Sequence, residues 1–509
     1  MNLLTLVQMA AAGMPDRVAV GPRPECGQAA AARRAPAGLT YSQLLDQARA
    51  GASLLRDCAA EEIVYLGVNG QAFPLALLSG AWAGVPVIPL NYRLGHDQLA
   101  GLLARHPRAL IISDLTRRTG ARVISTREWR SACARPAPGM PPWQDDPEAV
   151  AAVIYTSGTT SSPKAAVLRH RHLVSYLLGS VDFGAAGERD AMLVSVPPYH
   201  IAGVSSLLSN VYAGRRVVYL ETFTSHGWLD CVRTQQISHA LIVPTMLARI
   251  TEHLGDAAEA GVPTLRSLAY GGARMPVPVL ERAVRLFPAV GFVNAYGLTE
   301  TSSTIAVLGP DDHRLALAGD PLARTRLGSV GRLLPDVEAQ VRGPGGVLPP
   351  GQPGDIYVRG PQVSGEYRDQ GSQLDAEGWF ATRDRGWIDA DGYLFVEGRA
   401  DDTIIRGGEN IAPAEIEEVL LGHGAVADAA VVGVPDERWG QDIAAAVVLR
   451  PGRTAGAEEL RDWVRSRLRG SKTPALIVFR GELPQTPTGK ILRHEILASL
   501  VTGERDQPA

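Results

Sequence analysis

Cysteine and net charge are both scarce in this chain of 509 residues. Its four cysteines contain no C-x-x-C pair, which argues against a disulfide framework or a thiolate zinc site and is typical of a reducing compartment. The formal net charge is only −3, so the chain lacks the basic field that a nucleic-acid-binding or membrane-surface protein needs. These absences predict a cytoplasmic protein with no nucleic-acid partner.

The sequence also lacks a convincing membrane span. An uncharged stretch at residues 73–90 is interrupted by Gly80, Gly84, Pro86 and Pro89. This pattern predicts a buried helix followed by a buried strand. Residues 1–14 lack the basic segment of a signal peptide, so we expect no stable membrane insertion.

Apolar segments with the length of buried strands alternate with helical patterns through most of the chain. This alternation predicts parallel sheets with helices on their faces. From Gly328 onward, short alternating strands between Gly/Pro turns predict a smaller antiparallel unit. The last hundred or so residues predict a compact α+β module, and a chain this long exceeds a single hydrophobic core. We therefore predict an α/β fold with a large N-terminal domain at 1–398 and a small α+β C-terminal domain at 403–509.

One stretch of small polar residues follows a predicted strand that ends at Tyr155. It contains hydroxylated side chains and glycine and is closed by Lys164. A phosphate group requires hydroxyls, free backbone N–H groups and a cation at close range. Such a run is also typical of a linker, but the strand before it and the lysine after it favour a nucleotide loop. The spacing differs from that of the Walker phosphate loop.

Further predicted strands end in loops of small and polar residues at 197–203, 271–273 and 296–300. In open parallel sheets, ligands bind beyond the carboxyl ends of the strands. These loops and the polar stretch are therefore candidates for one pocket.

Taken together and in order, these blocks resemble the AMP-forming acyl-CoA synthetases. These enzymes belong to the adenylate-forming superfamily, which also contains luciferases and the adenylation domains of peptide synthetases. The resemblance covers nearly the whole chain. The blocks are Tyr155–Thr160 with Lys164, Pro198–Gly203, Gly271–Ala273, Tyr296–Glu300, Asp384, Gly398–Asp402, Gly407–Glu415 and Thr486–Lys490.

The resemblance implies a reaction in two steps, with ATP/AMP, Mg²⁺ and coenzyme A as cofactors. A carboxylate attacks the α-phosphorus of ATP and expels pyrophosphate, and the thiol of CoA then cleaves the acyl-adenylate. Positive charge and hydrogen-bond donors must offset the repulsion between the two anions. Glu300 is implied as the Mg²⁺ ligand and Thr299 as a donor to the α-phosphate. The simpler structural interpretations are a helix N-cap for Thr299 and a favourable first-turn acid for Glu300. Lys490 is implied to bridge the carboxylate and the α-phosphate, and the phosphate-holding residues are Thr156, Ser157, Gly158, Thr159, Thr160 and Lys164.

The resemblance also implies where the other groups bind. Tyr296 stacks on adenine, Asp384 accepts hydrogen bonds from the ribose with help from Arg399, and Asp401 is the hinge about which a mobile C-terminal domain turns, within 399–402. His200 is a gate at the mouth of the acyl pocket. The remaining nucleotide residues are Gly271, Gly272, Ala273, Asn294 and Gly297, the CoA residues are Gly407, Gly408, Trp439 and Lys472, and the acyl-pocket residues are Tyr199, Gly203, Val204, Ala295, Ser302 and Ser303. Most of these pocket residues are small or apolar, which favours a hydrophobic acid.

The sequence departs from the family pattern at four places. Ser161, Ser162 and Ala165 surround Lys164 where the family usually has Gly-x-Pro-Lys-Gly, and Arg383 replaces the glycine of Thr-Gly-Asp. Tyr270 replaces a small serine, and Ser471 replaces an aromatic residue near the CoA site. A residue other than glycine at a positive φ costs roughly 1 kcal/mol or more, so the ATP step is a candidate for weakening.

Alternatives therefore stand beside the two-step ligase. A degenerate member performs only thioesterification, with its adenylate supplied by a partner enzyme. A stand-alone adenylation enzyme loads a carrier protein. A non-catalytic binding protein and a luciferase-type oxygenase share the same motifs.

Overall fold

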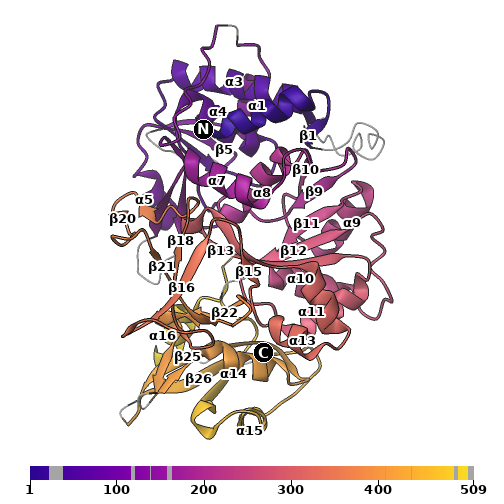
Figure 1. Cartoon of the computed structure of the whole chain (residues 1–509), viewed down its shortest axis with the longest axis vertical. Coiled ribbons are helices and arrows are strands. Elements are labelled where there is room, and N and C mark those ends of the chain that lie inside the picture. Colours follow the sequence, from indigo (N-terminus) through magenta and orange to yellow (C-terminus); the bar gives the residue numbers. More distant parts are fainter. Residues whose placement is uncertain are drawn as a thin grey trace.

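Four β-sheets and the helices on their faces form the described part of the molecule (Figure 1). The computed structural model describes residues 1–21, 38–115, 121–137, 139–156, 163–406, 409–436, 438–486 and 491–502. Seven residues with predicted roles lie outside these ranges, namely Ser157, Gly158, Thr159, Thr160, Gly407, Gly408 and Lys490.

The first sheet has eight strands and carries the predicted phosphate loop. Its parallel core runs in the order β7-β4-β3-β5-β6, and β8 pairs antiparallel with β7. The strands, in spatial order, are β20 (Gly371–Ser372), β19 (Glu366–Tyr367), β8 (Lys164–Arg169), β7 (Val150–Thr156), β4 (Val87–Pro89), β3 (Glu62–Leu66), β5 (Ala109–Ser113) and β6 (Arg122–Ile124).

The second sheet has nine strands and carries the other predicted loops. Its strands β13, β12, β11, β9 and β10 are parallel. The order is β15 (Arg332–Leu333), β14 (Ser303–Leu308), β13 (Gly291–Leu298), β12 (Ser267–Gly271), β11 (His239–Ile242), β9 (Ala191–Val194), β10 (Arg216–Tyr219), β1 (Val18–Val20) and β2 (Leu39–Thr40). The loops after β9, β12 and β13 consequently leave the sheet at one edge, as the sequence predicted.

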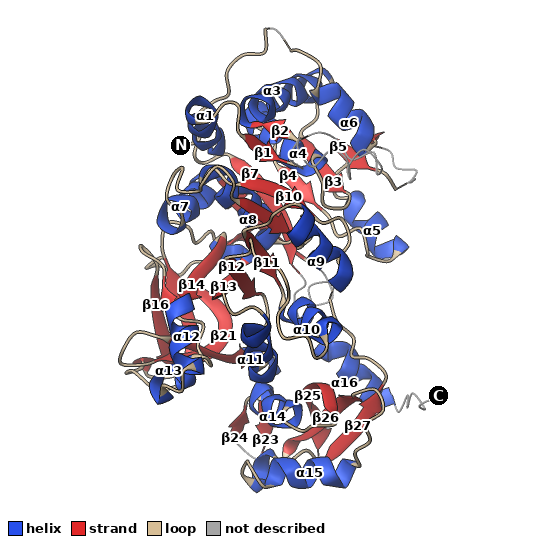
Figure 2. Ribbon diagram, turned by 90° about the vertical axis from the view of Figure 1, so that its right-hand side faces the viewer, coloured by secondary structure: helices blue, strands red, loops and turns tan. Residues whose placement is uncertain are grey.

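Two smaller sheets complete the fold. The predicted antiparallel unit is a five-stranded sheet of β17 (Gly346–Val347), β16 (Glu338–Gly343), β18 (Gly354–Arg359), β21 (Phe380–Ile388) and β22 (Leu394–Arg399). The sheet of the C-terminal unit contains β24 (Glu409–Ile411), β23 (Ile404–Arg406), β26 (Gly440–Leu449), β25 (Val426–Asp436) and β27 (Leu476–Arg480). Figures 1 and 2 show this last sheet with its helices at one end of the elongated molecule.

Helices cover the sheets (Figure 2), and their buried apolar side chains belong to the hydrophobic cores. Thr40 begins one of them with a capping box, in which its side chain accepts from the Gln43 N–H, as expected at that position. The helices are α1 (Leu3–Gly13), α3 (Tyr41–Asp57), α4 (Ala72–Ala83), α5 (His96–Leu103), α6 (Thr126–Cys133), α7 (His170–Ser180), α8 (Ile201–Tyr212), α9 (Ser225–Thr234), α10 (Pro244–Leu254), α11 (Val277–Leu286), α12 (Pro310–Leu317), α13 (Pro321–Arg326), α14 (Pro413–Leu421), α15 (Ala457–Arg465) and α16 (Arg493–Thr502).

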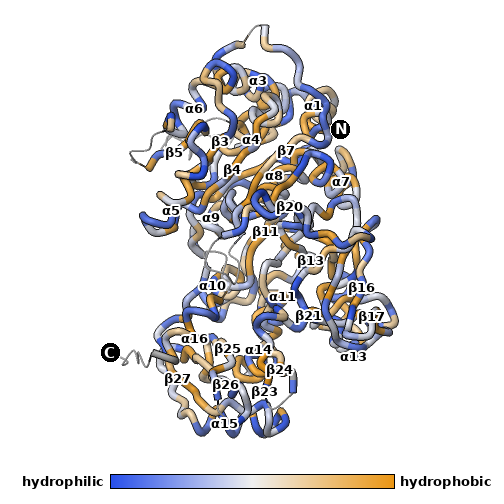
Figure 3. The backbone as a smooth tube through the Cα atoms, turned by 90° about the vertical axis from the view of Figure 1, so that its left-hand side faces the viewer, coloured by the Kyte–Doolittle hydropathy of each residue, from blue (hydrophilic) through white to orange (hydrophobic). Residues whose placement is uncertain are grey.

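The largest hydrophobic core lies between the first two sheets. It joins α1, α3, α4 and α8 to strands of both sheets, with Ile63 and Val217 among its buried members. The tube in Figure 3 shows the apolar residues gathered in the inner strands and helices. A separate core fills the C-terminal unit around Ile416 and Val431.

These observations confirm the predicted α/β class, with two corrections to individual elements. Lys164, expected at the end of the loop, is the first residue of strand β8, which the sequence reading missed, so the polar stretch connects two antiparallel strands. Strand β13 extends to Leu298, so Tyr296 and Gly297 lie in a strand and not in a loop. Among the described helices, none combines the length and apolar character needed to cross a membrane.

Candidate active site

Close backbone packing shapes the edge of the second sheet where β12 and β13 end. A Cβ atom on Gly271 would lie 2.2 Å from the carbonyl oxygen of Ala295, and one on Gly297 would lie 1.8 Å from that of Ser303. Gly272 has φ +83° and is exposed. Only glycine fits the first two positions, and the third favours it, so this edge presents bare backbone next to Tyr296.

Tyr296, Asp384 and Arg399 form one hydrogen-bonded group. The Tyr296 hydroxyl donates to Oδ2 of Asp384 at 2.6 Å, and the Nε of Arg399 lies 3.2 Å from Oδ1 of Asp384. Burial, and then the Asp384 carboxylate, raise the pKa of Tyr296 well above its usual value, so this phenol stays a donor. The Asp384 side chain is only 5% exposed, and a carboxylate held in this way is an acceptor that fits the ribose hydroxyls of a nucleotide.

Glu300 and Lys164 meet at one tyrosine that links the two large sheets. Glu300 lies in the short 3₁₀ turn η2 (Thr299–Thr301) and is buried. Tyr367 of β19 donates its hydroxyl proton to Oε1 of Glu300 at 2.6 Å, and the Nζ of Lys164 lies 5.0 Å from the centre of the Tyr367 ring. Burial and the Glu300 carboxylate raise the pKa of Tyr367. The sequence reading missed Tyr367, because nothing local marks a contact between residues that far apart.

The strands on either side of the predicted phosphate loop pair with each other. Thr156 pairs with Lys164, and Tyr155 pairs with Ala165; the Thr156 hydroxyl donates to the Lys164 carbonyl at 3.4 Å. Ala165 lies within β8, is 3% exposed and has no positive φ. The sequence-based concern about strain at Ala165 is therefore wrong, because strand geometry accommodates alanine there.

Arg383, which also replaces a glycine of the family pattern, does have a positive φ. Arg383 has φ +62°, a conformation that favours glycine, and lies between Thr382 and Asp384 in β21. Its side chain is exposed. From the sequence we expected the Arg383 side chain to add a positive charge beside the nucleotide site, and its position next to Asp384 is consistent with that expectation.

The predicted acyl side combines apolar and polar residues at the start of α8. His200 is the N-cap residue of this helix, and its ring centre lies 4.7 Å from that of Tyr199, with the two rings tilted by 51°. Burial lowers the pKa of His200 to about 4, so the imidazole is neutral at pH 7. The Ser303 hydroxyl donates to that of Ser205 at 2.8 Å, while Gly203 lets the helix approach the carbonyl of Pro197.

Three other residues that the sequence singled out, Val204, Tyr270 and Asn294, are in ordinary structural positions. Val204 is fully buried in the main core. The Tyr270 side chain is buried, and its hydroxyl is hydrogen-bonded to Nε2 of His313 at 2.8 Å, so it anchors β12 to α12. Asn294 donates its amide to the Ser329 carbonyl at 3.4 Å.

The predicted CoA residues lie in the C-terminal unit. Trp439 is 40% exposed, with the guanidinium groups of Arg438 and Arg406 at 4.8 and 5.6 Å from its ring centre. Lys472 pairs with Glu415 at 2.6 Å, which neutralises its charge in this arrangement. Asp401 is exposed within the 3₁₀ turn η3 (Ala400–Asp402).

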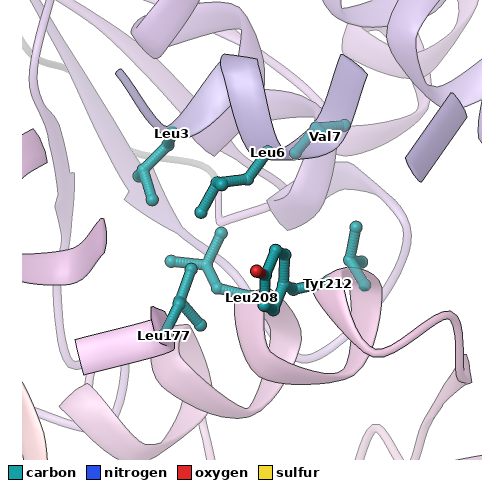
Figure 4. A pocket seen from close by; sticks show the side chains of 7 residues that line it. Leu3, Leu6, Val7, Leu177, Leu208 and Tyr212 are labelled. Atoms are coloured by element: carbon teal, nitrogen blue, oxygen red, sulfur yellow. The ribbon is translucent and has the colours of Figure 1, made fainter. Parts of the chain in front are cut away.

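An internal cavity lies away from all of these residues (Figure 4). It has a volume of only about 10 Å³ and is lined by apolar side chains of α1, α7 and α8, including Leu3, Leu177 and Leu208, and by Tyr212. An acyl group of any size exceeds it, so we treat it as a packing defect.

The donor set fits a magnesium nucleotide. Among the described residues no three His, Cys, Asp or Glu side chains gather around one point, and Mg²⁺ typically takes one or two carboxylates together with substrate phosphates. Glu300 supplies such a carboxylate, and the Tyr367 ring that holds it also lies under the Lys164 cation. The bare backbone of Gly271 and Gly272, the Asp384 carboxylate held by Tyr296, and the Glu300 carboxylate held by Tyr367 are thus the polar features available for such a ligand.

Comparison with known proteins gives consistent matches along the chain. The profile of the AMP-binding enzyme family matches residues 7–368, and that of the AMP-binding enzyme C-terminal domain matches residues 415–490. A fatty acid–[acyl-carrier-protein] ligase of Streptomyces coeruleorubidus is 32% identical over 485 residues, covering 90% of this chain and 91% of the relative. A feruloyl-CoA synthase of an Amycolatopsis species is 33% identical over 483 residues, covering 92% and 95%. The structure of O-succinylbenzoate coenzyme A synthetase from Bacillus subtilis, in complex with ATP and magnesium ion, superposes with a TM-score of 0.82 at 27% identity, covering 97% of this chain and 99% of that one.

Proposed function

The chain belongs to the AMP-binding enzyme family, and from this premise we propose that it converts a hydrophobic carboxylic acid into its CoA thioester through an acyl-adenylate. The family match together with its CoA-ligase relatives supports an AMP-forming acid–CoA ligase. The observation that carries the assignment is the presence of two carboxylates that are each held by a tyrosine hydroxyl. Glu300 is held by Tyr367 near Lys164, and Asp384 is held by Tyr296 and Arg399.

Each group has a task in the proposed reaction. An oxygen of the substrate carboxylate bonds to the α-phosphorus, and the bond from that phosphorus to the pyrophosphate oxygen breaks. Bound Mg²⁺ supplies a Lewis acid at the phosphates. Glu300 is its protein ligand, Lys164 and Thr299 offset the negative charge, and Asp384 orients the ribose. The thiolate of CoA then bonds to the acyl carbon, and AMP leaves.

His200 acts in this scheme as a neutral wall of the acyl pocket. Its pKa of about 4 keeps it from adding a charge next to the substrate carboxylate. Serine hydroxyls at Ser303 and Ser205 accompany the apolar residues of the proposed pocket. A panel of acids should therefore contain hydroxylated aryl acids beside aryl, alicyclic and fatty acids.

Pyrophosphate release with this acid panel tests the assignment. We expect acid-dependent release, followed by CoA-dependent formation of AMP and thioester. Glu300→Gln should lower pyrophosphate release by roughly 100-fold, the scale of a lost transition-state charge partner. Glu281→Gln, in an exposed ion pair with Arg324, is the matched control and should retain full activity. Absence of release with every acid would contradict the proposal and favour the thioester-only alternative.

A second candidate acceptor is a carrier protein. One relative with matching length is a fatty acid–[acyl-carrier-protein] ligase, and both acceptors present a pantetheine thiol. Acyl transfer should be measured with CoA and with a phosphopantetheinylated carrier protein at equal thiol concentration. Faster transfer to the carrier would assign the chain to carrier loading.

A further inference from the structure

Arg383 stands in a backbone conformation that nothing in its own side-chain contacts explains. Its φ is +62°, and an L-residue other than glycine in this region is strained by roughly the amount that glycine avoids. Strained residues persist where the surrounding structure holds them, and they cluster at functional sites. The strand around it is firmly held: the Thr382 hydroxyl donates to the Ile356 carbonyl at 2.8 Å, and Arg399 donates to the Thr382 carbonyl at 2.8 Å.

The guanidinium of Arg383 has no protein partner in the described ranges. No acidic side chain lies within ion-pair distance and no carbonyl accepts from it there, whereas Arg385, two residues further along β21, lies 3.6 Å from Asp355. The side chain is exposed. The positive φ costs stability for an arginine, and no described contact of the side chain offsets that cost. Glycine at this position would therefore be at least as stable.

The position of this charge points to the phosphate side of the site. Arg383 adjoins Asp384, whose carboxylate is held for the ribose by Tyr296 and Arg399. Its positive charge also acts on Tyr367, lowering the pKa of that phenol against burial and Glu300. Tyr367 is the residue that touches Glu300 and lies beneath Lys164.

We propose that Arg383 binds the β- and γ-phosphates of ATP and the pyrophosphate that leaves. This inference rests on the proposed function. Lys164 lies over the Tyr367 ring, and the positive charges of Arg383 and Arg399 both act on the Tyr367 phenol. A guanidinium can donate two parallel hydrogen bonds to a phosphate.

Equilibrium binding without an acid substrate tests the assignment, because no turnover then consumes the ATP. Calorimetry with MgATP, pyrophosphate and AMP compares wild type with Arg383→Gln, Arg383→Gly and Arg383→Lys. We expect the glutamine and glycine variants to bind MgATP and pyrophosphate roughly five- to twentyfold more weakly, the effect of losing a charge-assisted phosphate contact. AMP binding should change by less than about twofold, and lysine should restore part of the loss.

The two neutral variants separate charge from backbone strain. Both remove the guanidinium, but only glycine relieves the positive φ, so a loss common to both belongs to the charge. Arg385→Gln is the matched control for charge removal on the same strand and should leave all three affinities unchanged. Unaltered MgATP affinity in both neutral variants, or an equal loss of AMP affinity, would overturn the assignment of Arg383.

The same binding data distinguish a wrong role for Arg383 from a wrong proposed function. If wild type bound neither MgATP nor AMP, the nucleotide site itself would be refuted together with Arg383. If wild type bound both nucleotides and the variants matched it, only the role of Arg383 would be lost.

Discussion

At the scale of single residues, the site depends on side chains that hold other side chains. Tyr367 and Tyr296 each donate one hydroxyl hydrogen bond of 2.6 Å to a carboxylate. Such bonds to charged groups contribute about 1.5–3 kcal/mol. Both carboxylates are therefore oriented before any ligand binds, which lowers the cost of reorganisation during the reaction.

Replacing Tyr367 with phenylalanine tests this orientation. Tyr367→Phe keeps the ring beneath Lys164 but removes the donor to Glu300, so we expect adenylation to slow by roughly tenfold, the equivalent of about 1.4 kcal/mol. Pyrophosphate release under saturating MgATP measures the effect. Tyr357→Phe, whose ring packs under Arg342, is the control and should be fully active. Equal rates in the two variants would show that Glu300 needs no help from Tyr367.

At the scale of elements, strands β12 and β13 lie so close together that two adjacent glycines have different surroundings. Gly271 is the last residue of β12, and Gly272 follows it. A Cβ on Gly271 would collide with the Ala295 carbonyl at 2.2 Å, whereas a Cβ on Gly272 meets only Val243, at 3.9 Å. Gly271→Ala must therefore separate two paired strands, while Gly272→Ala meets only the strain of φ +83°.

We expect Gly272→Ala to lower the free energy of unfolding by about 1 kcal/mol and Gly271→Ala to lower it by more than about 3 kcal/mol. Urea unfolding followed by circular dichroism measures both values. The pair serves as its own control, because the residues are adjacent and undergo the same chemical change. Similar losses would mean that the backbone yields at Gly271.

Strand β8 gives a prediction about restoring the family glycine. Ala165 is buried in β8 opposite Tyr155, so Ala165→Gly should destabilise the hairpin by roughly 0.5–1 kcal/mol. MgATP affinity should not improve, because Ala165 has no strain to relieve. Tighter MgATP binding by this variant would instead implicate the missing glycine in phosphate contact.

The elements that the sequence predicted well are those with strong local signals. The buried helix α4, strand β4 and the Thr40 cap follow from apolar length, glycine and proline breaks and capping chemistry. Strand β8 was not predicted from the sequence, because α7 follows its apolar residues directly and no turn residues separate the two elements. The motifs predicted which residues meet, but the Tyr367 contact and the positive φ of Arg383 arise only from tertiary structure.

At the scale of the whole molecule, buried histidines couple stability to pH. His170 and His172 are each 1% exposed in α7, and mainly burial lowers their pKa values to about 4 and about 3. The unfolded chain takes up these protons near pH 6.5, whereas the folded chain resists them. Stability from these groups is therefore complete above about pH 6.5 and is lost as the pH falls towards 4, by up to about 1.4 kcal/mol per pH unit for each histidine.

Substitution of His172 should reduce this acid sensitivity. The Nδ1 atom of His172 accepts from the Arg169 N–H at 3.3 Å, and the amide oxygen of His172→Asn can replace this acceptor without titrating. Urea unfolding at pH 7, 6 and 5 should give a shallower pH dependence for the variant than for wild type. Titrating carboxylates affect both proteins equally, so parallel curves would refute the contribution of His172.

One ion pair links the nucleotide-binding part of the molecule to the C-terminal unit. Arg274, which follows the Gly271–Ala273 backbone, lies 2.5 Å from Glu418 of α14. Both side chains are nearly half exposed, so the pair contributes at most about 1 kcal/mol. That is enough to shift a balance between two orientations of the C-terminal unit by roughly fivefold.

If the C-terminal unit turns about Asp401 between the two half-reactions, breaking this pair should change their rates in opposite directions. Arg274→Gln should disfavour the half-reaction that uses the arrangement seen here and favour the other, because it alters the population and leaves the chemistry intact. Pyrophosphate release measures the first half-reaction, and thioester formation from supplied acyl-adenylate measures the second. The charge-reversed pair Arg274→Glu with Glu418→Arg should return both rates towards wild type, and Glu281→Gln, which breaks a pair within the N-terminal part, should change neither. A fall in both rates in Arg274→Gln would indicate a merely structural role, and the pair would not control the rotation.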